Sequence, residues 1–204
     1  MIFNFSLNYQ FNTRLNIGGS KVDQISETKL LGLMIKDDLT WKSNTEMLTK
    51  KAYMRMIILK KLVQFSIPIE ELIQIYILYI RSIVEQYAVV WHSSITNGER
   101  NDLERIQKVA LRIIFGNTYT TYSDALEQAG LDTLAARRKK LCLNFAKKCI
   151  KNEKTQSMFP TNELKVGTRN HEISKVTNAK TDRLAKSAIP YMQRLLNANW
   201  KHKK

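Results

Sequence analysis

The chain has 204 residues, and 44% of them are hydrophobic, which is enough for a folded core. Only seven glycines and three prolines are present, so the composition favours long helices over a turn-rich β sandwich. The 33 Lys and Arg residues exceed the 18 Asp and Glu residues, for a formal net charge of +15. Such a charge predicts attraction to a polyanion, either nucleic acid or an acidic membrane surface.

Two cysteines, Cys142 and Cys149, fall on one face of an expected helix. Because residues 1–10 have no signal-peptide pattern, we expect reduced, buried thiols in an intracellular protein of the cytoplasm or nucleus. The three histidines are scattered along the chain and predict no metal site.

Residues 1–41 are predicted to form β strands. The first strand alternates polar residues with Phe3, Phe5, Leu7, Tyr9 and Phe11, the period-two pattern of a half-buried strand. Residues 15–17 then lead into Gly18-Gly19, which predicts a strand, a glycine turn and a second strand. Residues 29–35 predict one further strand, in which Gly32 allows a close backbone approach. Asp37-Asp38 is expected to close this strand in a turn.

A helix is predicted from residue 43 to residue 65, with two apolar stripes. The first stripe consists of Leu48, Ala52, Met56, Leu59 and Val63, and the second of Met47, Met54, Ile58 and Phe65. Two stripes predict packing against two neighbouring elements, one of them the apolar segment that follows. Basic residues, among them Lys50 and Lys51, fill the gaps between the stripes.

The most apolar stretch of the chain, residues 68–91, predicts a single buried helix. Its polar residues, such as Gln74 and Glu85, recur at helical spacing on one side, and Pro68 precedes two glutamates in the first turn. A membrane span is the alternative, since about 20 apolar residues cross a bilayer. Charged and amide side chains interrupt the run, which favours a helix covered by neighbours on several sides.

Thr96 and Glu99 form a capping-box pattern that begins a helix ending near Phe115, before Gly116. Its expected inward residues are Leu103, Ile106, Ala110 and Ile113, and Arg105, Lys108 and Arg112 lie together on the opposite face. A short helix at residues 123–129 is predicted to end at Gly130.

Thr133 is expected to cap a helix that extends to about residue 151 and contains no acidic residue. Its predicted buried residues are Leu134, Leu141, Phe145 and Cys149, and a neighbouring face carries Arg137, Lys140, Lys147, Lys148 and Lys151. After residue 152 the sequence turns polar and basic, which predicts a flexible segment to about residue 182. A short amphipathic helix at residues 189–196 follows.

No catalytic constellation is present in the sequence. Asp37-Asp38 is the only tandem aspartate pair, and its neighbours fit a turn better than the metal-binding hairpin of a polymerase palm. We find no glycine-rich phosphate loop, Ser/His/Asp spacing or zinc-protease pattern. His92 beside Trp91 is expected to be a packed residue at a helix end rather than a base.

Two rows of basic residues, each on one face of a predicted helix and here called ladders, are the positive evidence for a function. The cations expected to contact nucleic acid are Lys50, Lys51, Arg105, Lys108, Arg112, Arg137, Lys140, Lys147 and Lys148. Such residues position a phosphate backbone without reading its sequence. A solvated face is the alternative for any single ladder, but two ladders and the net charge together favour nucleic acid. Base stacking is an option, beside core packing, for Tyr119, Tyr122 and Trp41.

Several segments resemble the region that follows the palm in reverse transcriptases of jockey-like non-LTR retrotransposons. They are KLLG (29–32), DLTW (38–41), YAVVWHSS (87–94), LERIQK (103–108), ALRII (110–114), YSDAL (122–126), GL (130–131), Leu134 with Arg137-Arg138, LC (141–142), IPYM (189–192) and RLLN (194–197). The segments occur in the family's order, and that order makes the resemblance more specific than any one of them.

The resemblance implies a mainly α protein in three parts. Residues 1–41 would be strands from the end of the palm, residues 42–151 a helical thumb-like bundle, and residues 152–204 a flexible basic extension with a short helix. The family's catalytic aspartates lie upstream in the palm, so no catalytic or metal-binding residue is carried over. RNA-directed DNA synthesis with Mg²⁺ is implied for the complete family enzyme only.

The implied role of this chain is to hold RNA/DNA or DNA duplex through its backbone, without sequence preference and with no membrane partner. Three alternatives stay open: a protein-interaction module with Tyr76, Tyr79 or Trp91 as exposed anchors, a binder of anionic lipid surfaces, or an inert element remnant. Residues 2–17 would normally pair with the palm, so their unprotected edge predicts self-association.

Overall fold

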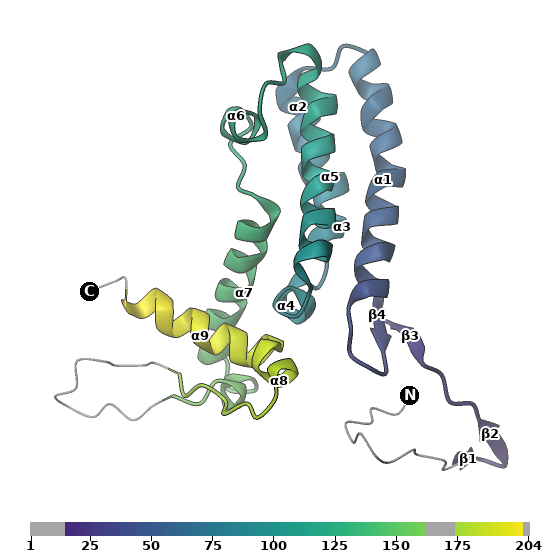
Figure 1. The fold of residues 1–204 in the computed structure, drawn as a ribbon, viewed down its shortest axis with the longest axis vertical. Coiled ribbons are helices and arrows are strands. Elements are labelled where there is room, and N and C mark those ends of the chain that lie inside the picture. The colour runs from purple at the N-terminus through teal and green to yellow at the C-terminus, as the bar shows by residue number, and fades with distance from the viewer. Residues whose placement is uncertain (1–14, 162–173, 202–204) are drawn as a thin grey trace.

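The structure, a computed structural model, describes residues 15–161 and 174–201. It is mainly helical, with two small antiparallel strand pairs at its N-terminal end (Figure 1). The predicted fold class is therefore confirmed in its two main features. The predicted strand at residues 3–11 lies outside the described residues, and so does most of the edge expected to drive self-association.

The first strand pair has the predicted form of strand, glycine turn and strand. β1 (Leu15–Ile17) pairs antiparallel with β2 (Ser20–Val22), and Gly18 and Gly19 between them have φ angles of +56° and +81°. Both angles lie in the left-handed region that glycine adopts without a steric cost, which explains why the glycine pair marks the turn.

The second strand pair corrects the prediction of one strand at residues 29–35. β3 (Glu27–Leu30) and β4 (Leu33–Lys36) form a hairpin whose turn residues, Leu31 and Gly32, both have positive φ angles. The expected close approach at Gly32 is present, since an added Cβ would lie 3.1 Å from the Gln86 Nε2 atom. The following turn is confirmed, because Asp38 accepts hydrogen bonds of 2.9 and 2.7 Å from the Thr40 amide and hydroxyl.

Helix α1 (Lys42–Gln64) buries only one of its two predicted stripes. Leu48, Ala52, Met56 and Leu59 are buried against α5 and the α2–α3 segment. In the second stripe, Met47 packs against the core, but Met54 is 63% exposed and Phe65 is 76% exposed, so most of this stripe does not pack. The prediction of two neighbouring elements, one of them the apolar segment that follows α1, is confirmed. The two neighbours share one side of α1, and among the described residues nothing covers the outer side.

The apolar stretch at residues 68–91 is not one helix, so that prediction was also wrong. It forms α2 (Ile69–Ile75), the π-helix η1 (Tyr76–Arg81), α3 (Ser82–Glu85) and α4 (Ala88–Trp91). The break lies at Tyr87, whose backbone is left-handed with a φ of 52°. The Trp91 indole donates a 2.9 Å hydrogen bond to the Gln86 carbonyl across this break. As a result α4 leaves the axis of α3 and contacts α7 and α9.

Helices α5 (Asn97–Phe115) and α6 (Tyr122–Gln128) begin and end close to where their local signals predict. The Thr96 and Glu99 side chains form the capping box at the start of α5, and Gly116 ends it with a φ of 50°. A short 3-10 turn, η2 (Gly116–Thr118), connects the two helices. The Thr121 hydroxyl accepts the Asp124 amide at the start of α6, and Gly130, with positive φ, follows its end.

Helix α7 (Leu134–Lys151) is capped by Thr133 as predicted, but its buried face is rotated from the expected one. Leu134 and Cys149 are buried as expected, whereas Phe145 is 40% exposed and Leu141 is only half-buried. The other buried residues are Arg138, Cys142 and Ala146. An arginine on the buried face breaks the apolar pattern on which the prediction depended.

The C-terminal part is more closely packed than the sequence predicts. Phe159, just after the 3-10 turn η3 (Gln156–Met158), is buried with Cys142, Cys149 and Leu196 in a second core. The Ser174 amide donates to Asn197 Oδ1 at 3.0 Å, and the Thr177 amide donates to Gln193 Oε1 at 2.8 Å. Both acceptors belong to α9 (Ala188–Lys201), which follows α8 (Asp182–Lys186) and extends the predicted terminal helix.

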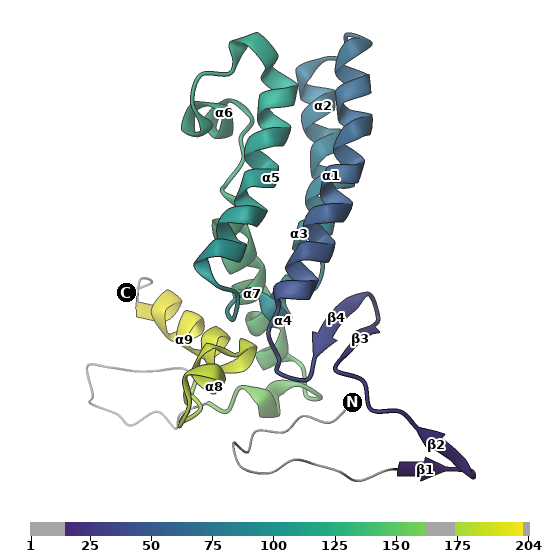
Figure 2. The same cartoon turned by 45° about the vertical axis from the view of Figure 1, so that its right-hand side comes forward.

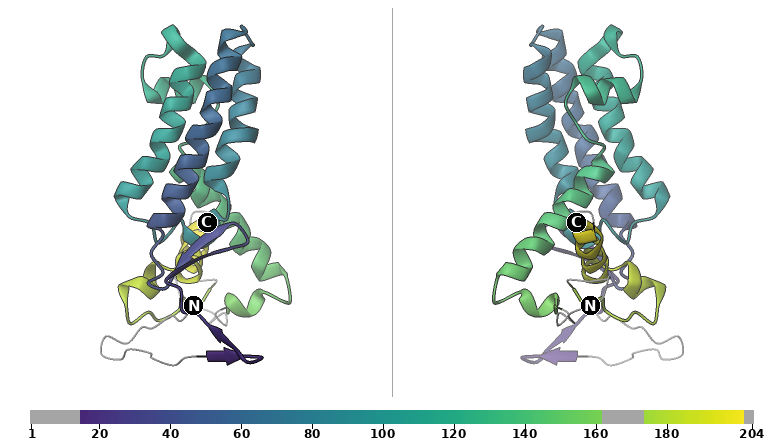
Figure 3. Two further views of the ribbon diagram at one scale, coloured as in Figure 1. Left: turned by 90° about the vertical axis from the view of Figure 1, so that its right-hand side faces the viewer. Right: turned by 90° about the vertical axis from the view of Figure 1, so that its left-hand side faces the viewer.

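The helices form an elongated bundle (Figures 1 and 2). Helices α1 and α5 and the α2–α3 segment lie side by side along the long axis and enclose the main core. The strand pairs, α8 and α9 lie together at one end, with the second core between α7 and α9 (Figure 3). Across residues 15–161 and 174–201, no helix combines the length and apolarity needed to cross a membrane.

Gly116 provides a test of the end of α5. Its φ of 50° and ψ of −119° are unfavourable for any residue with a Cβ, although the space around it is open. We expect Gly116→Ala to lower the free energy of unfolding by about 1–3 kcal/mol through the backbone alone, measured by urea denaturation. Gly98→Ala is the matched control, because Gly98 lies in the first turn of α5 without a positive φ. The control should leave stability unchanged or raise it by up to about 1 kcal/mol, and equal losses in both variants would contradict this account.

Candidate nucleic-acid interface

The outer face of α5 carries Arg105, Lys108 and Arg112, which we call the α5 ladder. All three side chains are exposed, and among the described residues none forms an ion pair. The Lys108 ammonium lies 5.1 Å from the centre of the Tyr122 ring, and the Arg112 guanidinium lies 5.3 Å from that of Tyr119. These cation–π contacts orient two cations of the ladder without neutralising them.

A partly buried polar network, built on Glu104 and Gln107, connects α5 to its neighbours. The Glu104 carboxylate accepts the Leu134 and Ala135 amides at 3.1 and 3.2 Å, so it caps the start of α7. It also accepts a hydrogen bond from the Tyr122 hydroxyl of α6. Burial, together with the hydrogen bond to Glu104, raises the pKa of Tyr122 far above its usual value, so this hydroxyl remains a donor.

Gln107 extends the network to the α2–α3 segment. Its Oε1 accepts the Tyr76 hydroxyl at 2.7 Å, and its Nε2 donates to the Asp132 carbonyl at 2.9 Å and to the Tyr122 hydroxyl at 3.1 Å. Gln107 and Tyr76 are fully buried, and burial raises the pKa of Tyr76 well above its ordinary value. Each polar group of the pair therefore has a partner, as a buried network requires.

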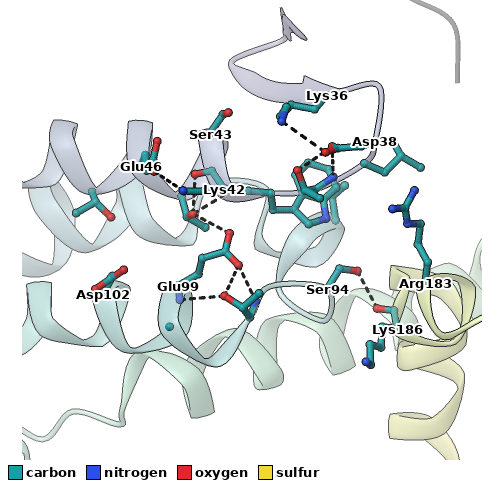
Figure 4. Close-up of a pocket in the computed structure, with 18 of the residues that line it drawn as sticks. Lys36, Asp38, Lys42, Ser43, Glu46, Ser94, Glu99, Asp102, Arg183 and Lys186 are labelled. Atoms are coloured by element: carbon teal, nitrogen blue, oxygen red, sulfur yellow. Dashed lines mark hydrogen bonds and ion pairs between the residues drawn. The ribbon is translucent and has the colours of Figure 1, made fainter. Parts of the chain in front are cut away.

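An open cleft of about 1260 Å³ lies near one end of the bundle (Figure 4). Its walls come from the loop after β4, the first half of α1, the start of α5, and α8. The Ser94 hydroxyl donates a 2.9 Å hydrogen bond to the Lys186 carbonyl and ties α8 to the α4–α5 connection. Helix α8 therefore supplies one wall of the cleft, which the α1–α5 bundle alone would lack.

The carboxylates of this cleft are mostly occupied by partners within the protein. Asp38 contacts Lys36 and Thr40, and hydrogen bonding to the Thr40 amide holds the Asp38 pKa below its ordinary value. Glu99 is held by Thr96 and accepts the Thr45 hydroxyl at 3.1 Å. Glu46 and Asp182 form ion pairs with Lys42 and Lys186. Three cations of the cleft have no ion pair among the described residues, namely Lys50, Arg105 and Arg183.

The structure does not gather all of the predicted basic residues on one surface. Lys50 and Arg105 share the cleft, and Lys108 and Arg112 continue along α5, but Lys51 is exposed outside the cleft. On α7, Arg137 forms an ion pair with Glu85 and Lys140 with Asp132. Lys147 is half-buried and Lys148 exposed near the C-terminal end of α7. The α7 residues thus form a separate set, partly neutralised by neighbouring carboxylates.

Arg138 is a buried cation that the sequence analysis did not single out. Its Nε donates to His92 Nδ1 at 3.3 Å, and its guanidinium lies 5.6 Å from the centre of the Trp91 ring. Burial lowers the pKa of Arg138 to about 10, so it keeps its charge at neutral pH. His92 is buried, as predicted for a packed residue at a helix end, and its ring meets that of Tyr191 edge-on at 5.9 Å.

Two expectations about individual side chains are now decided. Tyr76 and Trp91 are fully buried, so neither is an exposed anchor for a partner protein, whereas Tyr79 is 38% exposed. Cys142 and Cys149 are buried free thiols, as predicted, and burial raises the pKa of Cys142 to about 11.

Arg183 and Tyr53 line the cleft but were missed by the sequence analysis. Arg183 lies in a segment that the sequence describes only as polar and basic, and Tyr53 lies among the lysines of α1. No pattern in the neighbouring sequence marks either residue as part of a site, because the two residues line one cleft only through the packing of α8. Within residues 15–161 and 174–201, no group of three His, Cys, Asp or Glu side chains is placed to hold a metal ion.

Comparisons of the chain with protein-family models, with curated proteins and with solved structures found no match.

His92 predicts how stability depends on pH. Burial, with repulsion from Arg138 and Arg100, lowers its pKa from 6.5 to about 3, so the folded protein keeps it neutral. The unfolded chain binds a proton near pH 6.5 that the folded chain does not bind until about pH 3. The stability that neutral His92 contributes is therefore complete above pH 6.5 and is lost as the pH falls from 6.5 toward 3.

We expect the free energy of unfolding of the wild type to fall by up to about 1.4 kcal/mol per pH unit in this window because of His92. Urea denaturation at several pH values measures the loss. His92→Asn is the control, since its amide oxygen can still accept from Arg138 but does not titrate. The variant should have a flatter profile than the wild type, and parallel profiles would show that His92 is not the group responsible.

Proposed function

We propose that this chain is the C-terminal, post-palm part of a non-LTR retrotransposon reverse transcriptase, and that it holds template–primer duplex through the phosphate backbone. The binding would be independent of sequence. The polymerase chemistry, with its Mg²⁺, would be supplied by a palm outside this chain. This chain would contribute the positioning of the duplex.

The observation that carries the proposal is the α5 ladder, whose three cations form no ion pair with any described residue. Its three cations project from the outer face of a helix that Glu104 and Gln107 connect by hydrogen bonds to α6, α7 and η1. These hydrogen bonds fix the position of α5, so the backbone positions that carry the ladder are fixed relative to the rest of the bundle. Cation–π contacts also orient the Lys108 and Arg112 side chains, and side chains that are already oriented lose less freedom on binding a polyanion.

The spacing of the ladder suits a phosphate backbone. Residues 105 to 112 span roughly 10 Å of helix at 1.5 Å per residue. One strand of a B-form duplex presents a phosphate about every 3.4 Å along its axis, so the ladder covers about three phosphate positions. Contacts of this kind fix the orientation of a duplex and carry no sequence information.

The resemblance of the segments between residues 29 and 197 is a second, independent support. A helical body that follows small strand pairs agrees with the arrangement that the resemblance implies. The net charge of +15 agrees with a polyanionic partner.

An exposed apolar stripe on α1 favours a second candidate function, the docking of a partner protein. This α1 stripe consists of Met54, Ile57, Ile58 and Phe65, all exposed on one face. Tyr79 of η1 lies near it, since the Arg55 guanidinium is 4.3 Å from the Tyr79 ring centre. Binding through this stripe would be insensitive to salt and independent of the α5 ladder, which separates the two candidates.

The proposal is tested by the affinity for a short RNA/DNA hybrid across a salt series. Each phosphate contact contributes about one to the slope of log Kobs against log salt concentration, so Lys108→Ala/Arg112→Ala should make the slope shallower by about two. The affinity at low salt should fall in parallel, because the same contacts supply the binding free energy.

Arg137→Ala/Lys140→Ala is the matched control for this double variant. It removes the same charge, but from residues that are already ion-paired with Glu85 and Asp132. We expect the control to change the slope much less than the α5 variant does. Equal changes would show that only net charge matters, and a folded wild type that binds no hybrid at low salt would overturn the proposed function.

A further inference from the structure

We propose that the cleft between α1, α5 and α8 binds unpaired nucleotides at the end of the duplex, with phosphates on its free cations and a base against its aromatic wall. This inference rests on the proposed function and adds a second ligand class, single-stranded nucleic acid, at a place that adjoins the α5 ladder. It assigns functions to Tyr53 and Arg183, which the duplex-binding ladder does not use.

The free cations of the cleft come from three different elements. Lys50 belongs to α1, Arg105 to α5 and Arg183 to α8, and none forms an ion pair with a described residue. Figure 4 shows Arg183 projecting from α8 toward the segment that carries Asp38. Of the carboxylates that line the cleft, Asp38, Glu46 and Asp182 form ion pairs, whereas Glu99 and Asp102 form none with a described residue. The lining has six cations and five carboxylates, a formal excess of one positive charge, and its three free cations are the groups that would contact phosphates.

The aromatic wall distinguishes a single strand from a duplex. Trp41 and Tyr53 both line the cleft, and Tyr53 is 37% exposed. In a duplex the base faces are covered by neighbouring bases, so an aromatic side chain has nothing to stack on except at an end or an unpaired region. Proteins that bind single strands combine such aromatic faces with a positively charged groove.

The size and position of the cleft agree with the binding of a single-stranded end of nucleic acid. Its volume of about 1260 Å³ exceeds that of a pocket for one drug-sized molecule, roughly 300–1,000 Å³, and it is open at the surface. Arg105 belongs both to the cleft and to the α5 ladder, so the two binding surfaces are continuous. A duplex held along Lys108 and Arg112 would have a path from its end into the cleft.

The experiment compares a blunt RNA/DNA hybrid with the same hybrid extended by a single-stranded overhang of about five nucleotides. For the wild-type chain we expect the overhang to strengthen binding about tenfold, from stacking and added phosphate contacts. Overhangs on either strand and at either end are measured separately. A five-nucleotide single strand of the same sequence is the competitor.

Two single variants test the cleft, each with a matched control. Tyr53→Ala is compared with Tyr79→Ala, since Tyr79 is equally exposed, at 38%, but lies on η1 outside the cleft. Arg183→Ala is compared with Lys148→Ala, another exposed cation that does not line the cleft. Tyr53→Ala and Arg183→Ala should lose most of the overhang gain while the affinity for blunt hybrid stays within about twofold. Both controls should keep the gain.

The outcomes separate this inference from the proposed function. If blunt hybrid binds but no overhang strengthens binding, the cleft inference is overturned and the duplex function stands. If Tyr79→Ala removes the gain as completely as Tyr53→Ala does, the cleft assignment is wrong. If neither hybrid binds a folded wild type, the proposed function itself fails. The blunt-hybrid affinity of each variant also shows whether it is folded.

Discussion

The polar network that Glu104 and Gln107 form on α5 is the feature on which the rest of the structure depends. Glu104 caps α7 and accepts the Tyr122 hydroxyl of α6, while Gln107 accepts the Tyr76 hydroxyl of η1. These two side chains therefore connect three neighbouring elements to one helix. Hydrogen bonds in such a low-dielectric interior are costly to leave unmade, so they specify one arrangement of the helices where apolar contacts alone would permit several.

That arrangement determines where the charges lie. With one face of α5 committed to the network, its basic residues are directed outward, and the start of α7 is placed so that Arg138 enters the interior beside His92 and Trp91. Outward cations that form no ion pair with a described residue repel one another and lower stability. The polyanion that we propose as the ligand would offset this repulsion.

The sequence predicted what depends on local signals. The capping residues Thr96 and Thr133 and the terminating Gly116 located α5 and α7 closely, because each acts within a few residues of the helix end. The break at Tyr87 was missed, since neither glycine nor proline marks it and its left-handed backbone depends on how α4 packs on α7. The hairpin turn at Leu31 was missed because leucine rarely adopts a positive φ.

The same distinction applies to the candidate site. The α5 ladder was predictable, because its three cations share one helix face and need only the helical period. The cleft was not predictable, because Arg183 and Tyr53 lie far apart in the sequence and line the same cleft only through the packing of α8. The buried side of α7 was misjudged for a similar reason, since nothing in the sequence indicates that Arg138 is the inward residue.

The central claim is that this chain recognises a duplex by its backbone. The most direct test is the affinity of the wild-type chain for two RNA/DNA hybrids of equal length and unrelated sequence, measured from about 50 to 200 mM salt. The account predicts dissociation constants within about twofold of each other at every salt concentration, with log Kobs falling linearly for both. A preference of about tenfold or more for one sequence, or affinity that does not change with salt, would contradict it.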